Sequence, residues 1–217
     1  MVNGLQKIKH VIFVCITVFL ALFLSVFFVS ISSATFYENK TVSSSSIIGT
    51  LISTQTLFDQ TYSIDQVNDG QSIISQNLNL NINAENASIV EVKISLSGNT
   101  SNAQNVITSH LLPLLSDNAF NLNSNVDFSW NKTIGGSFAK FYLTNSSNTE
   151  LAQVSTQALS ILSSDALEFA AGTKAALQEG DQIVVEVVAN VIIAKNFNFE
   201  GRTLAESISY VEELLYA

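Results

Sequence analysis

Cysteine, proline and tryptophan are almost absent from this sequence: each occurs once in 217 residues, as Cys15, Pro113 and Trp130. Cys15 lies inside a long apolar run near the N-terminus. The rest of the chain therefore cannot form an internal disulfide, which is the usual cross-link of small secreted domains. One proline and nine glycines also exclude a collagen-like or proline-rich chain. A packed core, or association with other chains, must supply the stability.

Charged residues are scarce as well, at 12% of the chain against roughly 25% in ordinary soluble proteins. Lys7 and Lys9 precede the apolar run, and every Asp and Glu follows residue 34. The chain beyond that residue has seven Lys and Arg against eighteen Asp and Glu, a net charge of −11. Because a surface of this sign repels the phosphates of nucleic acids, we expect no DNA or RNA partner.

The N-terminus has the layout of an export signal. A basic start is followed by a run at 11–31 that is apolar except for three hydroxyl residues, and then by small residues that end at Ala34. Small residues at the −3 and −1 positions predict cleavage by signal peptidase between Ala34 and Thr35. The run is also long enough to span a bilayer, in which case residues 11–31 remain as a membrane anchor. Both alternatives place the rest of the chain outside the cell or on its surface.

Beyond residue 40 the main signal is the alternation of apolar and polar residues, which is typical of half-buried β-strands. It occurs at 78–82, 90–96, 126–130 and 139–143, between clusters of Asn, Ser, Gly and Asp. The run 183–194 is almost continuously apolar, and it predicts an internal strand covered on both faces. These runs predict an all-β fold, specifically a β-sandwich of the jelly-roll or immunoglobulin-like kind.

A few stretches favour helices. Residues 103–115 and the Ala- and Leu-rich residues 151–177 are expected to be helical. Thr203 and Glu206 have the spacing of a capping box ahead of a C-terminal helix, but the same segment also alternates like a last strand. The sequence leaves both open, and we expect one or two short helices beside the strands.

Residues 35–58 form an arm between the leader and the first well-patterned strand. The part at 41–57 is rich in Val, Ile, Ser and Thr and contains neither charge nor proline. Such an extended segment needs a sheet to join, either in its own chain or, by strand addition, in a neighbour. We accordingly divide the chain into a leader at 1–34, the arm at 35–58 and a β-sandwich domain at 59–217. The apolar residues that a donated strand would insert are Ile47, Ile48, Leu51, Ile52 and Leu57.

Five Asn-X-Ser/Thr sequons occur, at Asn39, Asn86, Asn99, Asn131 and Asn145. Asn86 precedes the strand that starts near residue 89, and Asn99 follows the end of that strand. The alternation places Asn131 and Asn145 just after strands. We therefore expect the last four in loops, where N-linked glycans are tolerated.

Few residues offer catalysis or metal binding. Beyond residue 34 the chain has one histidine, His110, and no cysteine, which excludes a Cys-His dyad and disfavours a histidine-ligated zinc site. The acidic cluster at 65–70 lacks the spacing of an EF-hand loop and predicts an Asx turn. Trp130 is expected in the core, and Glu212 and Glu213 on a solvated face. We expect no enzyme, no metal site and no cofactor.

The leader, the β-prone arm, the alternating strands and the Gly180-Asp181 turn into an apolar strand resemble secreted archaeal filament subunits. The nearest types are the thread and bundling-pilus proteins, with a more distant likeness to bacterial camelysin-like matrix fibre proteins. The resemblance covers the layout of residues 1–217 and not a motif. It implies a homopolymer on the cell surface, in which each subunit donates its N-terminal strand to the next and carries N-linked glycans.

The sequence therefore predicts an extracellular structural protein that assembles into a filament by donor-strand complementation. The main alternative is a secreted or membrane-anchored binding module, such as an adhesin, that stays monomeric. A secreted hydrolase is the third alternative.

Overall fold

The computed structural model describes residues 51–85, 87–193 and 199–216. These residues are mostly β-strand, in two antiparallel sheets with short helices between and after them, which agrees with the predicted all-β class. The strands are β1 (Leu51–Ser63), β2 (Leu78–Ile82), β3 (Ser88–Gly98), β4 (Phe128–Gly135), β5 (Phe138–Asn145), β6 (Gln157–Leu162) and β7 (Gln182–Ile193).

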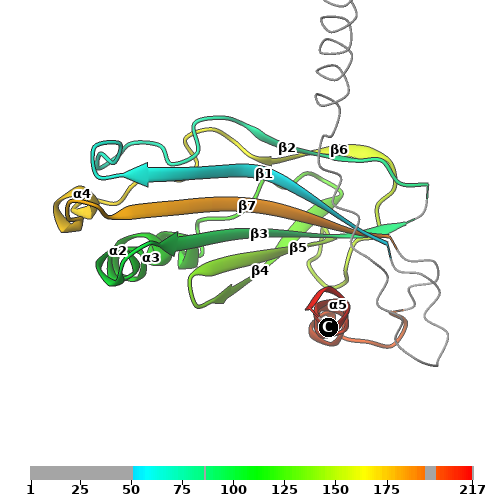
Figure 1. Ribbon diagram of the computed structural model, residues 1–217. Coiled ribbons are helices and arrows are strands. Elements are labelled where there is room, and N and C mark those ends of the chain that lie inside the picture. Colours follow the sequence, from blue (N-terminus) through cyan, green and yellow to red (C-terminus); the bar gives the residue numbers. More distant parts are fainter. Residues whose placement is uncertain (1–50, 86, 194–198, 217) are drawn as a thin grey trace, which may run out of the picture. The chain divides into compact units, whose positions relative to one another are not determined.

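The larger sheet has five strands in the order β1-β7-β3-β5-β4, and β2 pairs with β6 in a second sheet (Figure 1). Every neighbouring pair is antiparallel. β1 and β4 are the edge strands of the larger sheet. The first and the last strands of the described chain, β1 and β7, therefore lie side by side although they are more than a hundred residues apart in sequence.

One face of the larger sheet, here called the inner face, belongs to the main hydrophobic core. In β3 it presents Val90, Val92, Ile94 and Leu96, all nearly inaccessible to solvent. Alternate residues of β2 and β6 join the same core. Each fully buried aliphatic side chain contributes about 1.5–3 kcal/mol, so the predicted alternation is also the main source of stability.

The other face, here called the outer face, is covered at one end by the C-terminal helix α5 (Leu204–Tyr216). Val211 of this helix packs with Ile89, Tyr142 and Ile192 of the sheet in a smaller core. The segment that the sequence left open is thus a helix.

Helix α5 begins with the predicted capping box. The backbone N–H of Thr203 donates to Glu206 Oε2 over 2.8 Å, and that of Glu206 donates to Thr203 Oγ1 over 3.3 Å.

The predicted helix at 103–115 is confirmed as three consecutive helical segments, α2 (Ser101–Val106), η1 (Ile107–Leu111) and α3 (Leu112–Ser116). Thr100 caps its start, because its hydroxyl accepts the N–H of Ala103 over 3.0 Å. Ala103, Val106, Ile107, Leu111 and Leu115 form the buried face.

The predicted helix at 151–177 is wrong for most of its length. Only α4 (Thr173–Ala176) is helical, and β6 occupies the middle of the segment. In β6 the side chains of Leu159 and Ile161 are buried and that of Ser160 is exposed, which is the period of a strand. Pairing with β2, which lies about 80 residues earlier, overrides the helical propensity of Ala and Leu.

Two strand predictions also need correction. Val126 is 89% exposed and lies before β4, so the alternation in that region begins at Phe128. β7 is internal as predicted, but α5 covers its outer face only near Ile192, and Val184 and Val188 remain half-buried.

The described residues include no helix that is long and apolar enough to cross a membrane. The leader at 1–34 and its cleavage site between Ala34 and Thr35 lie outside the described residues.

Candidate functional site

β1 is attached to the sheet mainly through its backbone. It pairs with β7 from Leu51↔Ile193 to Ser63↔Gln182, with a bulge between Thr56 and Phe58. Of the β1 side chains that the structure describes, only that of Tyr62 is buried; Leu57 and Phe58 are half-buried against the main core. The opposite edge of β1 is the edge of the sheet. An edge strand of this length is a template for pairing with another chain.

The structure describes only some of the residues predicted for the donated strand. Leu51, Ile52 and Leu57 lie in β1 and pair with β7 of the same chain, whereas Ile47 and Ile48 lie outside the described residues. The strand continues to Ser63, past the predicted end of the arm at residue 58. In the single chain, the part of the arm that the structure describes, residues 51–58, pairs with its own sheet.

A polar network on the outer face connects this edge to the middle of the sheet. Thr54 Oγ1 donates to Asn190 Oδ1 over 2.8 Å, and Asn190 Nδ2 donates to Glu91 Oε1 over 3.0 Å. The Glu91 side chain is fully buried. Its other oxygen accepts the phenolic proton of Tyr142 over 2.7 Å. The carboxylate is therefore held by neutral donors from β7 and β5.

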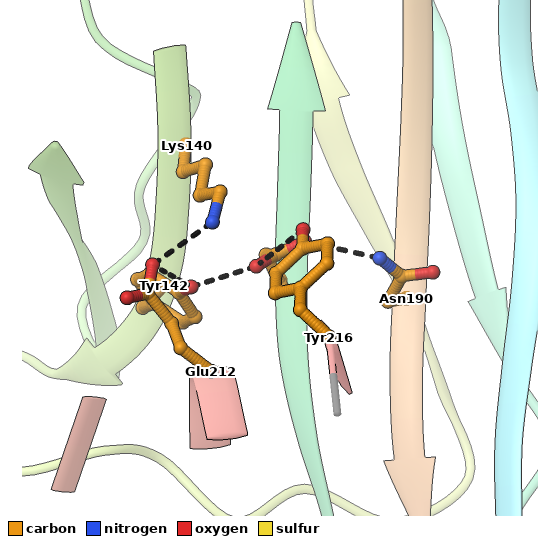
Figure 2. A network of polar contacts seen from close by, with 6 residues as sticks. Lys140, Tyr142, Asn190, Glu212 and Tyr216 are labelled. Carbon is orange, nitrogen blue, oxygen red and sulfur yellow. Dashed lines mark hydrogen bonds and ion pairs between the residues drawn. The ribbon is translucent and has the colours of Figure 1, made fainter. Parts of the chain in front are cut away.

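The same network reaches α5 (Figure 2). Tyr216 donates to Glu91 Oε1 over 3.0 Å, and Glu212 Oε1 lies 2.9 Å from Lys140 Nζ and 3.0 Å from the Tyr142 hydroxyl. The Lys140 ammonium also lies 4.1 Å from the centre of the Tyr216 ring, within cation–π range. We call Thr54, Glu91, Lys140, Tyr142, Asn190, Glu212 and Tyr216 the Glu91 network.

The position of Glu212 corrects the prediction that it belongs to a solvated face. Its side chain turns toward the sheet and binds Lys140 and Tyr142, whereas Glu213 is exposed as predicted. Along a helix, adjacent residues point in directions about 100° apart, so one of the pair can face the sheet while the other faces water.

The network shifts the acidity of its members. Burial raises the pKa of Tyr142 far above its usual value, and the nearby carboxylates of Glu91 and Glu212 add to this effect. Burial and Glu91 raise the pKa of Tyr216 as well. Burial alone would raise the pKa of Glu212, but hydrogen bonds from Lys140 and Tyr142 outweigh it and lower that pKa. Both phenols are thus protonated donors over the whole physiological range.

The arrangement holds structural elements together. Its donors and acceptors join side chains of β1, β7, β3, β5 and α5, and each buried polar side-chain atom of the described residues has a hydrogen-bond partner. A sequence reading misses it because Glu91, Asn190 and Tyr216 stand far apart in the chain. The only local signal is an acidic residue in the centre of an apolar strand.

The sequons occupy more varied places than predicted. Asn99 follows β3 as expected, and its amide bridges the Gly180 carbonyl and the Gln182 N–H over 2.9 and 2.7 Å. Asn131 lies inside the edge strand β4 and Asn145 is the last residue of β5, so the prediction of loops after strands is wrong for both. Asn39 and Asn86 lie outside the described residues.

The remaining candidate residues have structural surroundings. Asp69 accepts the backbone N–H groups of Gly172 and Lys174 over 2.7 and 3.1 Å, and so ties the loop at 65–70 to α4. His110 lies in η1 beside Gly172. Trp130 is in the core as predicted, 3% exposed, and its indole N–H donates to the Asn123 carbonyl over 2.7 Å.

Comparison with known proteins gives no match: the sequence matches no family model and no curated protein, and the fold matches no solved structure. The resemblance to archaeal filament subunits therefore stays a prediction, and the function is argued from the geometry alone.

Proposed function

We propose that this chain is the subunit of an extracellular cell-surface filament, in which β1 leaves its own sheet and takes the same place beside β7 of the next subunit. The two sheets are, in this proposal, the layers of a β-sandwich that the donated strand completes. The observation that carries it is the pairing of β1 along the whole of β7, since β1 is an edge strand in which only Tyr62 is buried among the side chains that the structure describes.

The energetics favour exchange over simple loss of the strand. Without β1, the inner residues of β7, such as Ile183, Val185 and Val187, lie at an open edge with unpaired backbone groups. A second copy of β1 restores the same hydrogen bonds and the same side-chain contacts. Exchange therefore conserves the interactions of the monomer, as in domain swapping.

The geometry of exchange determines the shape of the assembly. The donated surface, β1, and the accepting surface, the edge of β7, are different parts of the molecule. A contact between unlike surfaces repeats head to tail, and it gives a filament when the rotation between subunits does not close a ring. Glycans at the sequons and an export signal at residues 1–34 belong to the same proposal.

The second candidate is a monomeric surface-binding module. The pairing of β1 with β7 within one chain favours it, because this fold is already complete without a partner. Both candidates use the same strand pair, so an experiment must ask whether the two strands come from one chain or from two.

Paired cysteines answer that question, because Cys15 is the only natural cysteine. Two full-length chains, both with Cys15→Ser, are produced in one cell: one has Thr56→Cys and the other has Val188→Cys. These positions are register partners across β1 and β7, within reach of a disulfide. A filament requires a disulfide between the two chains, identified in the linked peptides by mass spectrometry.

The matched control replaces Thr56→Cys by Lys93→Cys. Lys93 is the register partner of Val188 on the opposite side of β7, and both belong to the body of the subunit. This pair links only when both cysteines are in one chain. If the Thr56 and Val188 variants form no more interchain disulfide than this control, β1 is not exchanged between chains and the filament proposal is wrong.

A further inference from the structure

Apart from Leu57, Phe58 and Tyr62, which pack against the main core, the side chains of β1 give little information about its register. Both faces of the strand carry mainly Thr, Ser and Gln, and most of these side chains are exposed. A strand with one buried face is fixed in register by its apolar residues, whereas a strand that is polar on both faces slips more easily. The observed pairing with β7 must therefore be selected by particular contacts.

The first contact is made by the Glu91 network. A carboxylate only accepts hydrogen bonds, so the buried Glu91 requires that Asn190 direct its NH₂ group inward, at 3.0 Å. The amide oxygen of Asn190 then points to β1 and needs a donor there. Thr54 supplies it with its hydroxyl at 2.8 Å. An apolar residue at this place would remove the hydrogen bond that the amide oxygen of the half-buried Asn190 makes to β1.

The second contact is at the other end of the strand. The phenol of Tyr62 donates to the backbone carbonyl of Ile73, and its ring meets Phe169 edge-on with 5.2 Å between ring centres. Thr54 and Tyr62 are eight residues apart on β1, and their partners on β7, Asn190 and Ile183, are seven apart because of the bulge.

The two contacts together define one register. A slip by two residues moves each side chain by about 6.6 Å, since a strand rises about 3.3 Å per residue. In one direction the slip places Thr56 opposite Asn190, which restores a hydroxyl there but carries Tyr62 away from Ile73. In the other direction it places Ile52 opposite Asn190. Only the observed register satisfies both ends.

We propose that the edge of β7, together with Ile73 and Phe169 beside it, is a two-point binding site for an extended segment with a hydroxyl donor opposite Asn190 and a tyrosine eight residues later. In this chain the segment is Thr54 to Tyr62. That a second copy of the chain supplies it rests on the proposed function; the two-point recognition does not. Glu91 acts here as a positioning residue, because it orients the amide that the segment meets.

The test measures register within one chain. Full-length chains with Cys15→Ser have Thr61→Cys together with either Val184→Cys, the observed partner, or Glu186→Cys, the partner after a slip that brings Thr56 opposite Asn190. Thr54→Val is then added to both. We expect the ratio of 61–184 to 61–186 disulfide to fall about fivefold, the equivalent of the net contribution of one hydrogen bond.

Thr56→Val is the matched control. It removes a hydroxyl from the same exposed face of β1, and the side chain of Thr56 has no hydrogen bond to a described residue. The ratio should not fall, and it should rise, because the slipped register loses the Thr56 hydroxyl that would face Asn190. Tyr62→Phe, which keeps the ring and removes the second contact, should lower the ratio as Thr54→Val does. Equal ratios in the Thr54→Val, Tyr62→Phe and unmodified chains would overturn the two-point site.

Thr54→Val also allows the two-point site and the filament to be tested separately. When Thr54→Val is placed in the Thr56→Cys chain of the co-production experiment, the interchain disulfide should decrease in yield. If no interchain disulfide forms even with Thr54 present, the filament is excluded, and the register ratio still decides whether the two-point site exists.

Discussion

The hydroxyl of Tyr142 donates to the carboxylate of Glu91 over 2.7 Å, and both side chains are completely buried. They are register partners on β5 and β3, so the contact is a cross-strand pair on the outer face. A buried carboxylate without a salt bridge is stable only when its oxygens are well supplied with donors. Here β5, β7 and α5 each provide one.

Removal of the Glu91 carboxylate should strongly destabilise the protein. Glu91→Leu leaves the phenol of Tyr216 and the amide of Asn190 without their acceptor, and it leaves the phenol of Tyr142 with Glu212 alone. We expect a loss of roughly 3 kcal/mol in the free energy of unfolding. Urea denaturation measures it. Glu213→Gln, which changes an exposed carboxylate on α5, should alter stability by less than about 0.5 kcal/mol. Similar values for both variants would contradict this role of Glu91.

Loss of one hydroxyl should loosen α5 without unfolding the sheet. Tyr216→Phe keeps the ring over Lys140 and removes the hydrogen bond to Glu91, which is worth about 1 kcal/mol. Amide hydrogen exchange should become severalfold faster in α5 and stay unchanged in β3 and β7. Uniformly faster exchange would show that α5 and the sheet open together.

Lys132 should be essential to the link between α3 and β4. Its ammonium donates to the backbone carbonyls of Leu115, Asp117 and Phe120 over 3.1, 2.5 and 2.7 Å, and burial lowers its pKa. Lys132→Met keeps a long unbranched side chain but removes all three hydrogen bonds. We therefore expect the free energy of unfolding, measured by chemical denaturation, to decrease by about 2–3 kcal/mol.

Lys93→Met is the control for that variant. The Lys93 ammonium lies over the Phe138 ring at 4.9 Å on the outer face, a contact worth about 0.5–1 kcal/mol. If the two lysine variants are equally stable, the three carbonyl contacts of Lys132 contribute no more than the single ring contact of Lys93.

The stability should vary little with pH near neutrality and should decrease at both low and high pH. Hydrogen bonds from Thr100 and Asn102 lower the pKa of Asp181 below 3.8, and those from Thr203 lower the pKa of Glu206 below 4.5. A carboxyl group whose pKa is lowered by folding stabilises the fold at any pH above its pKa in the unfolded chain. This stabilisation is lost as the pH falls through the pKa in the folded chain. Melting temperatures should therefore decrease only below about pH 4.

At alkaline pH the stability is lost in the opposite direction, as the pH rises. Burial raises the pKa values of Tyr62, Tyr142 and Tyr216 above 10.0, so their stabilising effect is complete below that pH and is lost as the pH rises further. Circular dichroism melting curves between pH 2 and pH 12 measure both limits. Asp181→Asn should reduce the acid-side decrease, and a melting temperature that already falls near pH 6 would contradict the assignment.

Much of the architecture follows from the sequence because it depends on local periodicity. The alternation at 78–82, 90–96 and 139–143 predicts strands with the observed buried faces, and the Thr203-Glu206 box starts a helix. These signals suffice because each side chain is directed by its own backbone geometry, whatever the rest of the chain does.

Only the tertiary structure decides what lies on the outer face. Periodicity assigns Glu91 and Tyr142 to the polar side of their strands, which is correct, and it cannot show that α5 returns from the far end of the chain to bury them. For the same reason the sequence predicts a helix at 151–177, where only the pairing with β2 determines that β6 is a strand. Local propensity amounts to a few tenths of a kcal/mol per residue, whereas partners brought together by folding contribute several kcal/mol, so contacts distant in sequence prevail.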